Sequence, residues 1–139
     1  MSTFQRRALI AAFLTLALGF WIRFTPAAPE WLRDSAGGAA YVMLWALLAA
    51  AARPKGGAAV PAAGAFLLTC AIEALQAWHP LWLDAIRRTT AGRLVLGTTF
   101  AWHDFPPYAA GGIASYVLLR LLSSRGGGRA VARGGASAR

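Results

Sequence analysis

The sequence predicts an all-α membrane protein in which four transmembrane helices form an antiparallel bundle. Three observations lead to this fold class: an apolar composition, four long apolar runs, and one carboxylate placed inside a run. Of the 139 residues, 58% are hydrophobic and only 14% are charged, and the mean hydropathy is +0.50. This composition is too apolar for an ordinary soluble domain. One cysteine and two histidines give no disulfide and no Cys- or His-based metal site, so we predict no metal and no cofactor.

Four apolar runs are the predicted membrane spans. They cover residues 8–22, 36–52, 57–78 and 108–122. A spanning helix needs roughly 20 mostly apolar residues, and only the third run is long enough by itself. Flanking aromatic and arginine side chains extend the shorter runs, because arginine can carry its charge out to the interface. Pro54, in a short polar break, stops the second helix and makes the second and third helices a hairpin.

The first run also fits a secretory signal peptide, because Arg6 and Arg7 precede an apolar stretch. Against this, Arg23 follows the run directly, and Pro29 follows the best candidate cleavage point at Ala28. We therefore expect a helix that is retained.

The distribution of charge predicts the orientation of the bundle. Of the 14 lysines and arginines, nine fall on the side of the N-terminus and five on the opposite side. This bias places both termini in the cytoplasm of a multi-pass plasma membrane protein. Five tryptophans fall at the outer ends of the predicted spans or in the outer loops, as an interfacial aromatic belt requires. They are Trp21, Trp31, Trp78, Trp82 and Trp102.

The chain divides into a transmembrane domain, residues 1–122, and a basic cytoplasmic tail, residues 123–139. The tail is rich in Gly, Ala, Ser and Arg and has no apolar periodicity, so we predict that it is disordered. It has no aromatic side chain to stack on bases, so we expect its arginines to contact the headgroups of the lipid bilayer and no nucleic acid.

Glu73 is the only charged residue in the third run. A carboxylate at the centre of a bilayer costs about 2.5–3.5 kcal/mol on insertion scales, so it requires a partner or a function. Thr69 and Gln76 share its helix face, because residues three and four apart are neighbours. Glu73 lies five residues before the outer end of the run, roughly 7–8 Å below that end.

The segment between the third and fourth runs, residues 79–107, supplies candidate partners for Glu73. Its apolar part is far too short to span, so we predict a short re-entrant or interfacial piece. Arg87 or Arg88 is expected to pair with Glu73, the alternative being that both arginines reach the headgroups. The predicted polar cluster is Glu73, Gln76, Arg87, Arg88, Asp104 and Tyr108.

Three residues near the fourth run also have structural interpretations. Asp104 precedes two prolines and is expected to cap the fourth helix, with or without a second role in the cluster. Tyr108 can simply join the aromatic belt. Gly111 is expected to permit close helix packing.

Between residues 73 and 111 the chain carries an ordered set of short motifs: Glu73-x-x-Gln76, Trp82-Leu83-Asp84, Gly92-Arg93-Leu94, Asp104 and Tyr108-x-x-Gly111. This order resembles an uncharacterised bacterial family of small four-helix membrane proteins known only as a domain of unknown function. More distantly, it resembles the VanZ-like membrane proteins associated with teicoplanin resistance. The similarity covers about residues 38–121 and implies membrane topology and a polar cluster, with no established activity.

Three classes of function are compatible with the sequence. The first, which we expect, is a non-enzymatic binding or accessory protein of the cell envelope, whose outer cluster holds an envelope lipid or another polar headgroup ligand. The second is a small proton-coupled transporter with Glu73 as its titrating group. The third is an enzyme on envelope lipids, with Glu73 or Asp104 and His103 as acid and base, although no nucleophile or phosphate-binding motif supports it. A homo-oligomer fits each class.

Overall fold

The computed structural model describes residues 1–96 and 99–134, which form six α-helices and one 3-10 helix and contain no β-strand. The predicted all-α class is confirmed. In chain order the elements are α1 (Thr3–Phe24), α2 (Glu30–Ala52), α3 (Ala59–Gln76), α4 (Leu81–Arg87), α5 (Thr90–Leu96), the 3-10 helix η1 (Trp102–Asp104) and α6 (Phe105–Gly134).

Three of the described helices, α1, α2 and α3, are long and apolar enough to cross a membrane. The fourth predicted span lies in α6, which does not meet the same criterion over its described part. Prolines at its start, a glycine pair and Arg120 reduce its mean hydropathy. A bundle with four crossings therefore stays a prediction.

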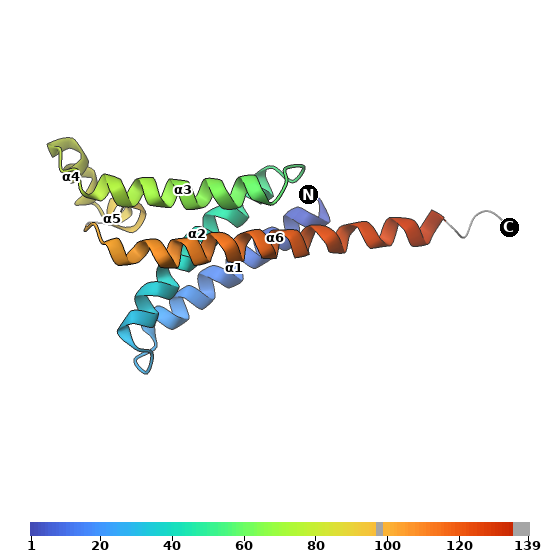
Figure 1. The fold of residues 1–139 in the computed structure, drawn as a ribbon, viewed down its shortest axis with the longest axis horizontal. Coiled ribbons are helices and arrows are strands. Elements are labelled where there is room, and N and C mark those ends of the chain that lie inside the picture. The colour runs from blue at the N-terminus through green and yellow to red at the C-terminus, as the bar shows by residue number, and fades with distance from the viewer. Residues whose placement is uncertain (97–98, 135–139) are drawn as a thin grey trace.

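α2 is the central helix, and it packs against α1, α3 and α6. Figure 1 shows the N-terminus and the α2–α3 connection near the middle of the long axis, whereas α4, α5 and the start of α6 lie toward one end and the C-terminal part of α6 extends toward the other. α2 ends at Ala52, two residues before Pro54, and α3 starts at Ala59. The predicted hairpin between the second and third helices is confirmed.

The start of α1 is fixed by a reciprocal cap. The Gln5 backbone N–H donates to Ser2 Oγ over 3.1 Å, and the Ser2 N–H donates to Gln5 Oε1 over 2.7 Å. The Gln5 side chain also donates to the carbonyl of Ala51 over 3.1 Å. These bonds hold the start of α1 against the end of α2.

The segment between α3 and α6 is made of short helices. α4 and α5 have seven residues each, about 10 Å of helix and well short of the length needed to cross a bilayer. A re-entrant or interfacial position for this segment stays a prediction. Residues 97–98, at the end of its apolar part, lie outside the described residues.

α6 continues to Gly134, so residues 123–134 are helical where the sequence predicted disorder. A helix that has already formed adds one hydrogen bond for each further residue, which makes extension much easier than nucleation. The Ser123 hydroxyl donates to the Leu119 carbonyl within this helix over 2.8 Å. Residues 135–139 of the predicted tail lie outside the described residues.

Gly111 allows α6 to approach α2 closely. A Cβ atom at this position would lie 2.6 Å from the carbonyl oxygen of Ala39 and 2.9 Å from its Cα. Both atoms belong to the backbone, so they could move away only if the two helices separated. The predicted packing role of Gly111 is confirmed.

Gly111→Ala is expected to lower the free energy of unfolding by roughly 1–3 kcal/mol, the usual cost of overpacking. Gly64→Ala is the matched control, because a Cβ at Gly64 in α3 meets nothing within 4 Å. The control is expected to leave stability unchanged or raise it by roughly 0.5–1 kcal/mol. Thermal unfolding of the detergent-solubilised proteins measures both, and equal melting temperatures would contradict the packing argument.

Candidate functional site

Glu73 is buried in the last turn of α3, with only 1% of its surface exposed. Thr69 and Gln76 are buried on the same face, as the helical spacing predicts. α3 ends at Gln76, earlier than the apolar run itself, so Glu73 lies closer to the helix end than expected.

The Glu73 carboxylate accepts hydrogen bonds from three donors on three parts of the chain. Its Oε1 accepts from the backbone N–H of Ala101 over 2.7 Å. Its Oε2 accepts from the Tyr108 hydroxyl over 2.8 Å and from Gln76 Nε2 over 3.3 Å. Since a carboxylate offers about four acceptor sites, most of its capacity is used. One side chain therefore joins α3, the segment that precedes η1, and α6.

The expected ion pair between Glu73 and an arginine is not formed among the described residues. The prediction was wrong because a backbone N–H, a hydroxyl and an amide supply the donors instead. Arg88 is exposed at the surface. Arg87 is buried, at 4% exposure, but it is bound elsewhere.

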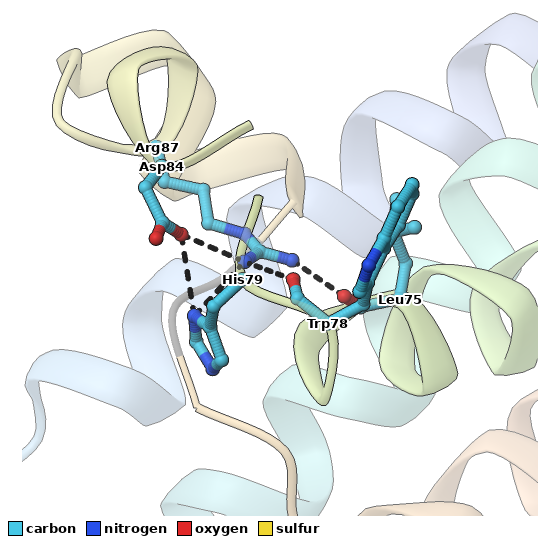
Figure 2. Close-up of polar contacts among 5 residues, drawn as sticks. All are labelled: Leu75, Trp78, His79, Asp84 and Arg87. Atoms are coloured by element: carbon cyan, nitrogen blue, oxygen red, sulfur yellow. Dashed lines mark hydrogen bonds and ion pairs between the residues drawn. The ribbon is translucent and has the colours of Figure 1, made fainter. Parts of the chain in front are cut away.

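Arg87 binds the C-terminal end of α3 (Figure 2). Its Nη2 donates to the Leu75 carbonyl over 2.7 Å, and its Nη1 donates to the Trp78 carbonyl over 2.9 Å. The last carbonyls of a helix have no partner within the helix, and the negative end of the helix dipole favours a cation. Arg87 therefore ties α4 to the end of the helix that carries Glu73.

Asp84 and His79 complete the surroundings of Arg87 (Figure 2). Asp84 Oδ1 accepts from Arg87 Nη1 over 3.2 Å and lies 3.2 Å from His79 Nδ1. Desolvation raises the pKa of Asp84, but the hydrogen bonds and charges of His79 and Arg87 outweigh it and hold the pKa below the usual 3.8. The ionised carboxylate thus helps to orient the guanidinium.

Asp104 does not cap α6, contrary to the sequence prediction. A capping side chain accepts from the N–H of the second or third helical residue, and in α6 these are Pro106 and Pro107, which have no N–H. Among the described residues its one ion pair is with His103, whose Nε2 lies 3.6 Å from Asp104 Oδ1. Partial burial, followed by the charge of Glu73, raises the pKa of Asp104 above its usual value.

Asp104 lines a charged hollow of about 330 Å³ between the α1–α2 turn and the start of α6. Arg23 and Asp34 form an ion pair on one wall. Arg33, half-buried, makes no ion pair with any described residue. The lining residues are Arg23, Arg33, Asp34, Gly37, Gly38, His103, Asp104 and Tyr108.

A second hollow, of about 210 Å³, adjoins the charged hollow and shares Gly37, Gly38 and Tyr108 with it. Thr69 and Gln76 also line this second hollow. The buried network around Glu73 therefore lies directly behind the charged hollow, with Tyr108 common to both.

The predicted cluster is thus divided in space. Glu73, Gln76 and Tyr108 form one network, and Asp104 lies beside it in the charged hollow. Arg87 belongs to a separate site at the end of α3, and Arg88 is outside both. The sequence analysis missed Arg23, Arg33 and Asp34 as lining residues. In the sequence, Arg23 directly follows the first predicted span, and Arg33 and Asp34 lie shortly before the second. Charges of opposite sign thus stand at the two ends of the outer turn that joins these spans.

Residues 1–96 and 99–134 define an all-helical fold with three helices long and apolar enough to cross a membrane and a polar network at one end of the bundle. Residues 27–112 match the family model described as a protein of unknown function, DUF2809. The chain belongs to this family, and the resemblance to an uncharacterised domain family is confirmed. Of the residues that line the charged hollow, only Arg23 lies outside the matched region. No solved structure matches the chain.

Glu73→Ala is expected to lower the free energy of unfolding by roughly 2–4 kcal/mol, because it leaves the Ala101 N–H and the Tyr108 hydroxyl without an acceptor. Glu73→Gln should cost about 1 kcal/mol or less, since its carbonyl can face Ala101 while its NH₂ donates to the Tyr108 oxygen. Thermal unfolding in detergent separates the variants. An equal loss in both would mean that the charge itself, and not the hydrogen bonding, stabilises the fold.

Proposed function

We propose that this protein is a non-enzymatic membrane protein that holds a polar headgroup ligand in the charged hollow. In this proposal α1, α2, α3 and the first part of α6 cross the bilayer, and both termini lie in the cytoplasm. The hollow then opens toward the outer side. A bacterial plasma membrane, and the distant similarity to VanZ-like proteins, belong to the same proposal.

The arrangement of the helices supports this topology. The hollow is built from the end of α1, the start of α2 and the start of α6, which meet at one end of the bundle. Five tryptophans at or near these helix ends and in the segment between α3 and α6 are exposed, as an interfacial belt requires. They are Trp21, Trp31, Trp78, Trp82 and Trp102.

The observation that carries the binding proposal is the presence of two opposite charges in the hollow, Arg33 and Asp104. Arg33 has no ion pair among the described residues, and Asp104 has only one, with the exposed His103. Both line the charged hollow, yet no ion pair joins them to each other. Charged side chains in a partly desolvated site are stabilised by a complementary partner. A bound ligand can supply that partner. Glu73, by contrast, accepts hydrogen bonds from three neighbouring donors, which favours a structural role over proton transfer.

Single cysteines test this proposal. In a Cys70→Ala background, Gly37→Cys places a thiol in the charged hollow, where a Cβ meets nothing within 4 Å. Gly57→Cys, in the α2–α3 connection with equally open space, is the matched control. In intact cells, an impermeant maleimide should label Gly37→Cys from outside and leave Gly57→Cys unlabelled.

The same variants report ligand binding in detergent. An added mixture of phosphatidylcholine, phosphatidylethanolamine and phosphatidylglycerol should slow labelling at Gly37→Cys and leave the rate at Gly57→Cys unchanged. Labelling of Gly57→Cys alone from outside would overturn the orientation. Equal labelling rates with and without the phospholipids would overturn the binding proposal.

A further inference from the structure

We propose that the ligand is a phospholipid whose headgroup carries a phosphate and a primary amine, and that one of its acyl chains lies in a groove beside the charged hollow. The inference rests on the proposed function and specifies its ligand. It follows from two observations. The hollow continues into an apolar groove. Its lining also carries Arg33, which has no ion pair among the described residues, and Asp104, whose one ion partner among them is the exposed His103.

The apolar groove has a volume of about 300 Å³ and lies between α1, α2 and α5. Its walls include Leu16, Phe20 and Phe24 from α1 and Leu44 from α2, with Leu94 from α5. Phe20, Phe24 and Leu94 are exposed, so the groove is open along its side. In the proposed topology this opening faces the hydrocarbon of the outer leaflet. An acyl chain fits such a surface without leaving an apolar environment.

The groove and the charged hollow meet at Arg23 and Gly37, which line both. A Cβ at Gly37 would meet nothing within 4 Å, so the junction between the two spaces is open. A polar space that runs directly into an apolar one matches an amphiphile, which carries a headgroup and a chain in one molecule. A soluble polar ligand would leave the groove unused.

Arg33 is the residue that we assign to the phosphate. The charge of Arg23 is offset by its ion pair with Asp34, so Arg33 is the cation of the hollow without an ion pair among the described residues. A guanidinium presents two parallel N–H donors that match the oxygens of a phosphate. Arg23 lines both the charged hollow and the apolar groove. It therefore lies at the level where the phosphate of a bound phospholipid would connect to the acyl chains.

Asp104 is the residue that we assign to the amine. Its carboxylate accepts no hydrogen bond from any described residue, because the prolines that follow it have no N–H to donate. A primary ammonium offers three N–H donors, whereas a quaternary ammonium offers none and a glycerol headgroup offers no positive charge.

Native mass spectrometry of the full chain in detergent tests this assignment. The probe is an equimolar mixture of phosphatidylethanolamine, phosphatidylglycerol and phosphatidylcholine. The wild-type protein should retain phosphatidylethanolamine roughly tenfold over the other two lipids, the effect of about 1.4 kcal/mol from one charge contact. Arg33→Gln should reduce the retention of all three lipids, and Asp104→Asn should abolish the preference among them.

Two exposed residues away from the hollow provide matched controls: Arg93→Gln in α5 and Glu30→Gln at the start of α2. Both should retain phosphatidylethanolamine as the wild-type protein does. If Arg93→Gln reduced retention as much as Arg33→Gln, the bound lipid would be a general boundary lipid and the inference would fail.

The remaining outcomes separate this inference from the proposed function. Equal retention of the three lipids, or a preference for phosphatidylglycerol, would overturn the amine assignment and leave a headgroup-binding protein. If none of the three lipids were retained, both this inference and the proposed function would be overturned. Water-soluble phosphoethanolamine should displace the lipid only weakly, and displacement at concentrations equal to the lipid would overturn the role of the groove.

Discussion

The hydrogen bonds of one buried carboxylate determine how the outer end of this bundle is arranged. Glu73 has 1% of its surface exposed, and burial without partners would be costly for a carboxylate. It avoids this cost by accepting from Ala101, Tyr108 and Gln76. A short irregular segment and two long helices must therefore meet at the last turn of α3. The positions of Tyr108 and of Asp104, just before α6, follow from that meeting.

The network also creates the charged hollow. Glu73 holds the Tyr108 hydroxyl, and a Cβ at Gly38 would lie 3.0 Å from the Tyr108 ring, so the start of α6 rests against the start of α2. This contact brings Asp104, just before α6, to the same space as Arg33 near the start of α2. The carboxylate that looks most functional in the sequence is in this account a positioning residue. The two charges that it brings together, Arg33 and Asp104, are the ones to which we assign recognition of the proposed ligand.

The sequence predicts the helices well because long apolar runs and Pro54 leave few alternatives. It also places Glu73 and Gln76 on one face and Gly111 at a helix contact, since both follow from helical spacing. It does not predict the partner of Glu73, because an arginine nearby in the chain and a backbone N–H twenty-eight residues away satisfy a carboxylate equally well. Only the fold decides between them.

Two further differences have distinct causes. The cap expected at Asp104 could have been excluded from the sequence, because the prolines at the second and third helical positions have no N–H to donate. The roles of Arg23 and Arg33 could not be assigned in this way. They line the hollow only because α1 and α2 bring them beside a segment that lies about seventy to eighty residues later in the chain.

Amide hydrogen exchange at Ala101 tests the central claim most directly, because this N–H donates to Glu73 in the structure. In the wild-type protein and in Glu73→Gln, the Ala101 amide should exchange slowly. In Glu73→Ala it should exchange roughly tenfold to a hundredfold faster, since a hydrogen bond to a charged group contributes about 1.5–3 kcal/mol. Exchange at Ala101 that is equally fast in all three proteins, or unchanged in Glu73→Ala, would contradict the account.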